Sequence, residues 1–148
     1  MVTLEELIDH HKEFAQNVIK NARKFVPQIV ISVDNDINVF TLVGHINIRE
    51  EIKKIIQMIE ISNKKPDWVV VMSEGYMETV KLEDKDKLKN RGSLEQRYLN
   101  GDTNIIWVFQ IQVYTKEGKK MVVYGIKNLE LIKLYEDDKF GGCLTINW

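Results

Sequence analysis

The sequence has one cysteine, two prolines and eight glycines in 148 residues, and this scarcity excludes several classes of protein. Cys143 alone cannot form an intramolecular disulfide, so nothing ties the fold to an oxidising compartment and we expect a cytoplasmic protein. No Pro-, Gly- or Ser-rich stretch divides the chain, whose length suits one domain. The sequence therefore predicts a single domain over residues 1–148.

Long apolar runs are also missing. The longest uncharged apolar run, residues 68–72, is far below the ~20 residues that a membrane-spanning helix needs. Acidic side chains interrupt the amino-terminal segment, which excludes the uninterrupted apolar core of a secretion signal. We therefore expect no contact with a membrane.

No charge of one sign dominates, because 21 basic and 22 acidic side chains give a net charge of −1. Without a strong overall field, nucleic acid would need a local basic patch to bind, so we do not expect it as a partner. No GxGxxG, P-loop, HExxH or paired CxxC pattern occurs, and the sequence predicts no cofactor and no zinc site. His11 lies on an apolar helix face, where a hydrogen-bonded core histidine is the usual interpretation.

Two segments have the spacing of amphipathic helices. Apolar residues recur at three- and four-residue steps over residues 4–25 and again over 48–62. Thr3 and Asn47 each stand three residues before a glutamate, Glu6 and Glu50, which is typical of a capped helix start. Pro27 stops the first helix, because the residue before a proline is driven out of the helical region.

The remaining apolar patterns predict strands. Residues 29–33 and 37–43 alternate around a polar turn at 34–36, and 105–114 and 121–126 flank Glu117 and Gly118, so each pair predicts a hairpin. Residues 68–72 are apolar without alternation, as in a strand buried on both faces at the centre of a sheet. Residues 129–135 and 143–148 are two further candidates. This order predicts an α+β fold, with two amphipathic helices on a mixed, mainly antiparallel sheet of about five to seven strands.

Residues 81–104 are rich in charge and poor in large apolar groups, which predicts a polar loop or a lid over a ligand. Arg91 and Arg97 are candidate ligand contacts within it, and Tyr98 could stack on a base. Nearby acidic residues nearly cancel the positive charge, so a solvated loop of mixed charge is the competing interpretation.

A polar segment follows the apolar run at 68–72. Ligands of open α/β sheets bind beyond the carboxyl ends of strands, so Ser73 and Tyr76 are candidate ligand contacts. Glu74 is the best single candidate for a catalytic carboxylate, acting as a general base or as a metal ligand. The competing interpretation is structural: Glu74 satisfies backbone donors at a turn whose geometry Gly75 supplies.

Asp67, Glu83 and Lys85 supply two carboxylates and a lysine. Over these few residues the pattern resembles that of the restriction-endonuclease-like nucleases, and the resemblance implies carboxylates that hold a divalent metal for phosphodiester hydrolysis. An acidic residue two positions before a lysine also arises by chance in a charge-rich stretch. Asp67 precedes the expected strand whereas Glu83 lies in the expected loop, so the pattern by itself does not bring them together.

Three functions remain open, and whether the protein is an enzyme is one of the open questions. No set of nucleophile, base and stabiliser is evident, so we rank a non-catalytic interaction or regulatory module first. A homo-oligomer is one form of it, since a partner subunit could cover Trp148 at the end of the sequence. A metal-dependent hydrolase or nuclease centred on Glu74, with Asp67, Glu83 and Lys85, ranks second. A small-molecule binder with residues 81–104 as a mobile lid is the third.

Overall fold

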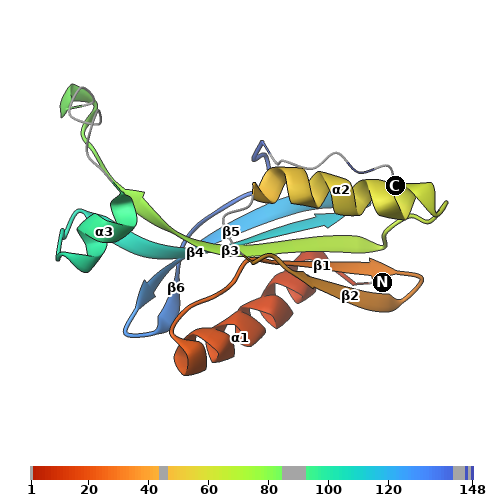
Figure 1. Ribbon diagram of the computed structural model, residues 1–148, viewed down its shortest axis with the longest axis horizontal. Helices are drawn as coiled ribbons and strands as arrows, with labels where there is room; N and C mark the ends of the chain where they lie inside the picture. Colours follow the sequence, from red (N-terminus) through yellow and green to blue (C-terminus); the bar gives the residue numbers. More distant parts are fainter. Residues whose placement is uncertain (1, 44–46, 85–92, 142–145, 147) are drawn as a thin grey trace.

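The computed structural model describes residues 2–43, 47–84, 93–141, 146 and 148. In this part of the chain three helices pack on a six-stranded sheet in the order β2-β1-β3-β4-β5-β6, which confirms the α+β prediction (Figure 1). Every pairing among these strands is antiparallel, so the sheet is not mixed. The strands are β1 (Gln28–Val33), β2 (Asp36–Thr41), β3 (Trp68–Glu78), β4 (Ile105–Thr115), β5 (Gly118–Lys127) and β6 (Glu130–Asp137).

The two predicted helices are present as α1 (Leu4–Ala22) and α2 (Ile48–Ile61), and the capping residues act as expected. Thr3 Oγ1 accepts a hydrogen bond from the Glu6 N–H at 3.1 Å, and Asn47 Oδ1 accepts one from the Glu50 N–H at 3.3 Å. These bonds satisfy backbone donors that the first turn of a helix leaves unpaired. No helix in the described ranges is long and apolar enough to cross a membrane.

The helices lie on opposite faces of the sheet and cover different halves of it (Figure 1). The α1 side chains pack mainly over β3 to β6, in a cluster that includes Leu7, Ala15, Ile19, Val70, Met72, Phe109, Ile111, Tyr124 and Leu131. The α2 side chains pack over β1 and β3, with Ile29, Ile31, Ile52, Ile55, Ile56, Val69 and Val71. Among the described residues, no helix covers the β2 side of the α1 face or the β6 side of the α2 face.

Strand β3 is longer than the sequence predicted. It continues past residue 72 to Glu78, because β4 is equally long and pairs with it along its whole length, from Trp68 with Thr115 to Glu78 with Ile105. Ser73, Glu74 and Tyr76 consequently lie within a strand rather than beyond its carboxyl end. This part of β3 is only partly buried, because α1 and α2 do not cover it, and polar side chains are therefore tolerated there.

Part of the predicted polar loop at 81–104 is helical. Helix α3 (Leu94–Leu99) begins at Ser93, whose Oγ accepts a hydrogen bond from the Gln96 N–H at 3.4 Å, and it packs against β3 and β4. Ser93 and Gln96 match the serine-to-glutamine spacing of a capping box, which is the sequence signal for this helix. The predicted strand at 143–148 lies mostly outside the described residues, and neither 146 nor 148 is in a strand.

Candidate binding groove

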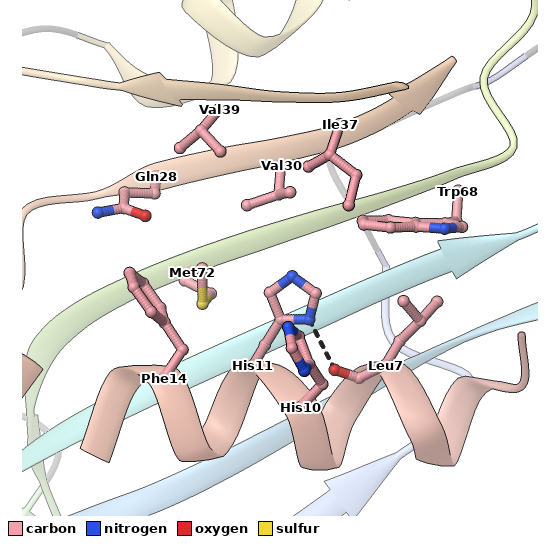
Figure 2. Close-up of a pocket in the computed structure, with 10 residues that line it drawn as sticks. All are labelled: Leu7, His10, His11, Phe14, Gln28, Val30, Ile37, Val39, Trp68 and Met72. Atoms are coloured by element: carbon pink, nitrogen blue, oxygen red, sulfur yellow. Dashed lines mark hydrogen bonds between the residues drawn. The ribbon is translucent and has the colours of Figure 1, made fainter. Parts of the chain in front are cut away.

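A groove lies on the α1 face of the sheet, between α1 and the strands β1, β2 and β3 (Figure 2). It exists because α1 packs over the other half of the sheet, so β1 and β2 extend beyond the edge of the helix. Its volume is about 200 Å³. The lining residues are Leu7, His10, His11, Phe14, Gln28, Val30, Ile37, Val39, Trp68 and Met72.

The outer wall of the groove is apolar and open to solvent. Ile37 and Val39 on β2 are 63% and 57% exposed, and Phe14 across from them on α1 is 43% exposed. Scattered single apolar side chains are normal on a protein surface, whereas several around one concavity indicate a binding site. The ten lining residues include no Asp, Glu, Lys or Arg, so the groove carries no fixed charge of its own.

Gln28 places a buried polar atom in this apolar wall. Its side-chain oxygen Oε1 is buried and accepts no hydrogen bond from the described residues. A buried acceptor left without a donor costs about 1–3 kcal/mol relative to one that is paired. The groove therefore holds an unsatisfied position that a donor on a bound molecule would fill.

His11 adds a second acceptor. Its Nδ1 lies 2.7 Å from the carbonyl oxygen of Leu7, and because a carbonyl only accepts, Nδ1 carries the hydrogen. In the neutral ring Nε2 is then an acceptor, and Figure 2 shows this nitrogen turned toward the sheet side of the groove. Burial lowers the pKa of His11 below its ordinary 6.5 and outweighs the bond to Leu7, so the neutral ring is favoured. The ring edge packs against Trp68, with ring centroids 5.7 Å apart.

Glu74, the best carboxylate candidate from the sequence, lies on β3 outside this groove and is half-buried. Its Oε2 accepts hydrogen bonds from the Phe25 N–H and from Trp107 Nε1–H, both at 3.1 Å. Burial raises the pKa of the Glu74 carboxyl above its ordinary 4.5, and the two hydrogen bonds oppose this shift. These contacts tie the segment after α1 to the sheet. Glu74 therefore accepts a backbone donor, as in the structural interpretation, but it does so from within β3 and not at a turn.

The carboxylates of the nuclease-like pattern are not brought together. Asp67 Oδ2 accepts hydrogen bonds from Ser32 Oγ at 3.0 Å and from the Asn35 N–H at 3.1 Å, so it holds the β1–β2 turn. Asp67 directly precedes β3 and Glu74 is the seventh residue of that strand, so about 23 Å separate their backbone positions. Glu83 is exposed beyond the end of β3, and Lys85 lies outside the described residues. Within the described ranges, no three His, Cys, Asp or Glu side chains are grouped to hold a metal ion.

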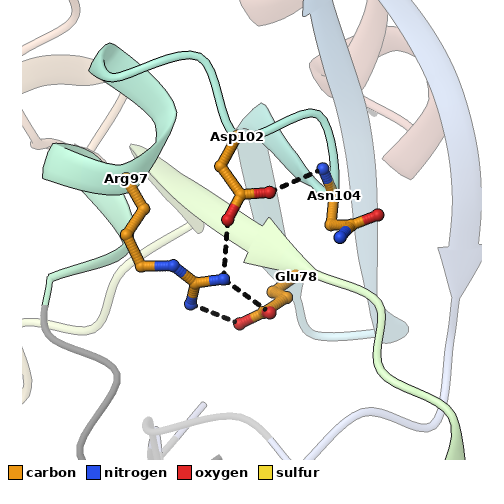
Figure 3. A network of polar contacts seen from close by, with 4 residues as sticks. All are labelled: Glu78, Arg97, Asp102 and Asn104. Atoms are coloured by element: carbon orange, nitrogen blue, oxygen red, sulfur yellow. Dashed lines mark hydrogen bonds and ion pairs between the residues drawn. The ribbon is translucent and has the colours of Figure 1, made fainter.

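The candidate ligand contacts are mostly engaged with the protein itself. Arg97 donates two hydrogen bonds to the Glu78 carboxylate, both at 2.9 Å, and one to Asp102 at 2.8 Å (Figure 3). The Tyr98 ring packs against that of Tyr76, with centroids 5.2 Å apart. This network fastens α3 to the end of β3. The other two candidates are Ser73, which is partly buried on β3, and Arg91, which lies outside the described residues.

Sequence reasoning did not single out the groove. The alternation of β2 marked Ile37 and Val39 as one face of a hairpin, and such a face is ordinarily buried. The available signal was His11 on the apolar face of α1 together with Gln28 at an inward position of β1. Neither residue indicates a groove from the sequence alone, because the groove forms only where α1 packs over the sheet.

Comparison with known proteins adds no assignment: no protein-family model matches the chain, and no curated protein or solved structure is significantly similar to it.

Proposed function

We propose that this protein is a non-catalytic binding module whose site is the groove between α1 and β2. The observation that carries the proposal is the unpaired Oε1 of Gln28 in an otherwise apolar wall. An apolar cleft with few, convergent polar atoms is the usual form of a small-molecule site, because apolar area supplies affinity and the polar atoms fix orientation.

The chemistry of the lining defines the ligand class. Gln28 Oε1 and His11 Nε2 are both acceptors, so the ligand carries an N–H or O–H donor. No lining residue is Asp, Glu, Lys or Arg, which favours a neutral molecule. A cavity of about 150 Å³ is known to hold benzene, so a groove of about 200 Å³ suits one aromatic ring or a compact bicyclic group.

The proposal uses neither the lid nor the hydrolase centre. The described part of residues 81–104 packs on β3 and β4 through α3, whereas the groove lies beside β1 and β2. The separation of Asp67 from Glu74 gives the hydrolase interpretation no support. A non-catalytic site keeps that part of the function ranked first from the sequence, an interaction or regulatory module, and a small-molecule ligand is taken from the function ranked third, here without its lid.

The test is an NMR titration of the labelled protein with indole, which carries a single N–H donor, and with 1-methylindole, which lacks that donor. We expect shift changes at the Gln28 amide, His11 and Trp68, with roughly fivefold tighter binding of indole, the worth of one hydrogen bond. Gln28→Leu should abolish the preference for indole. Gln110→Leu, a partly buried glutamine on the opposite face of the sheet, is the matched control.

Two outcomes would contradict the proposal. One is the absence of shift changes at the lining residues with both compounds. The other is equal affinity for indole and 1-methylindole in the unmodified protein, which would show that Gln28 takes no part.

A further inference from the structure

The two edge strands of the sheet, β2 and β6, differ in how they are protected. Strand β6 carries Glu130, Lys133 and Glu136, and its pairing with β5 is irregular between Val123 and Tyr124. Charges and bulges of this kind block the addition of another strand. Strand β2 pairs with β1 in unbroken register over six residues, and Asp36 is its one charged side chain. Within the described sheet, β2 is therefore the edge without such protection.

The free edge of β2 presents specific backbone groups. The β1–β2 turn consists of Asp34 and Asn35, with φ of 52° and 66°, and a two-residue turn of this kind closes on a hydrogen-bonded pair, Val33 with Asp36. Bonded and non-bonded pairs alternate in an antiparallel ladder, so Ile37, Val39 and Thr41 direct their N–H and C=O groups away from β1. The Asp67 N–H donates to Ser32 O at 2.7 Å, which confirms that Ser32, opposite Ile37, faces β3 instead.

The same residues that present open backbone groups also present apolar side chains. Ile37 and Val39 are more than half exposed on the α1 face, at the rim of the groove. A strand added here would gain backbone hydrogen bonds from them and bury their side chains at the same time. Edge addition of this type derives its affinity from main-chain bonds and its specificity from alternate side chains.

We propose that the strand that docks on β2 is β2 of a second copy of this chain, paired antiparallel with Asn38 at the twofold axis. In this register Ile37 of each copy lies opposite Val39 of the other, so four apolar side chains meet on the α1 face. On the other face the two Asn38 amides adjoin and can hydrogen-bond to each other. The contact is isologous, as the commonest class of homodimer requires.

Charge does not oppose this partner. Each Asp36 lies opposite Phe40 of the other copy, which leaves the two carboxylates about 14 Å apart along the strands. This exceeds the Debye length of about 8 Å at physiological salt, so their repulsion is screened. No basic residue occurs in β2 to require an acidic partner.

The dimer also extends the apolar wall of the groove. A twofold axis normal to the sheet keeps both α1 helices on the same face, so the two grooves open toward each other. Ile37 and Val39 of the second copy then extend the outer apolar wall that one copy leaves exposed. Ligand binding in the groove does not require the second copy, and the two proposals are tested separately.

The first test is disulfide trapping. Asn38 at the axis forms a non-hydrogen-bonded pair with its counterpart, with Cα atoms about 4.5 Å apart, which a disulfide can span. We expect Asn38→Cys, in a Cys143→Ser background, to give a covalent dimer on mild oxidation. Lys53→Cys, exposed on α2, is the control for random collision. A yield no higher than that of the control would overturn the proposed register.

The second test is sedimentation equilibrium of the unmodified chain, for which we expect a concentration-dependent dimer. Val39→Pro removes an outward-facing donor without removing a β1–β2 hydrogen bond, so it should remain folded and become monomeric. Val39→Lys, which changes only an exposed side chain, should give the same result if the proline variant does not fold. An unmodified chain that stays monomeric at its highest soluble concentration would overturn the proposal.

A third measurement separates this proposal from the ligand site. Gln28→Leu should leave the yield of the Asn38→Cys disulfide unchanged, since Gln28 is not on the edge strand. Loss of the disulfide in that variant would show that dimer formation depends on the groove, which would contradict the independence of the two sites.

Discussion

Val30 and Val39 lie directly opposite each other on β1 and β2, yet Val30 is 5% exposed and Val39 is 57% exposed. The α1 core includes Val30 and ends there, so the boundary of the helix layer falls between two paired residues. The apolar face of the sheet continues onto β2, beyond the part that α1 covers. The groove and the exposed side chains of the β2 edge both follow from this.

Gln28→Leu should stabilise the protein in the absence of ligand. The variant removes a buried acceptor that has no donor and adds apolar volume to an apolar wall, so we expect a gain of roughly 1 kcal/mol in the free energy of unfolding. Urea denaturation measures it, with Gln110→Leu as the matched control. A loss of stability would show that the Gln28 amide is paired in solution.

His11 should make stability depend on pH. Its folded-state pKa is lowered by burial, so below the ordinary value of 6.5 the unfolded chain binds a proton that the folded chain resists. The contribution of His11 is therefore fully present above pH 6.5 and is lost as the pH falls through the lowered folded-state pKa. His11→Gln should flatten this part of the urea-stability profile. An unchanged profile would contradict the prediction.

Glu74 should contribute to stability as an acceptor rather than as a charge. Glu74→Ala leaves the Phe25 N–H and Trp107 Nε1–H without their acceptor, which we expect to cost about 1–3 kcal/mol at pH 7. Glu74→Gln keeps an acceptor oxygen and removes a partly buried charge, so it should be at least as stable as the unmodified protein. Chemical denaturation of both variants is the measurement. An equal loss in both would show that the carboxylate charge is required.

Arg97 should govern the local stability of α3. Its planar guanidinium bonds Glu78 through two nitrogens, a geometry that lysine does not reproduce (Figure 3). Arg97→Lys should increase amide hydrogen exchange in α3. The protection of β3 up to Met72 should be kept, because α3 contacts β3 near Tyr76 and Glu78, at the carboxyl end of that strand. Exchange measured by mass spectrometry tests this, with Arg49→Lys on the exposed surface of α2 as control. Unchanged exchange in α3 would contradict it.

Much of the fold could be predicted from local signals. Thr3 and Asn47 cap the two long helices as their spacing predicts, and the alternation around Asp34 and Asn35 predicts the first hairpin. The end of β3 could not be predicted in this way. Residues 73–78 are polar for a strand and become one because β4 pairs with them throughout. Strand β4 is distant in sequence, and the residues of β3 do not indicate how long β4 is.

The groove could not be predicted from the sequence, and the described site candidates that the sequence predicted do not line it. Its position after the apolar run at 68–72 makes Glu74 a candidate catalytic carboxylate, and burial raises its pKa, but the donors from which it accepts hydrogen bonds belong to Phe25 and Trp107, both remote in sequence. Arg97 and Tyr98 were expected to contact a ligand, and the structure pairs them with Glu78 and Tyr76. In a charge-rich segment the sequence shows which charged and aromatic side chains are present, but not which residues they contact in the fold.

The sequence by itself determined the helical and strand periods, the capped helix starts and the chemistry that each face can offer. Ile37 on β2 and Ile111 on β4 occupy equivalent positions in alternating patterns, and nothing local distinguishes them. Only the tertiary structure decided that Ile111 is fully buried beneath α1 and that Ile37 is 63% exposed. The reason is geometric: a single helix covers only part of a six-stranded sheet, and the position of α1 selects which apolar residues remain open for binding.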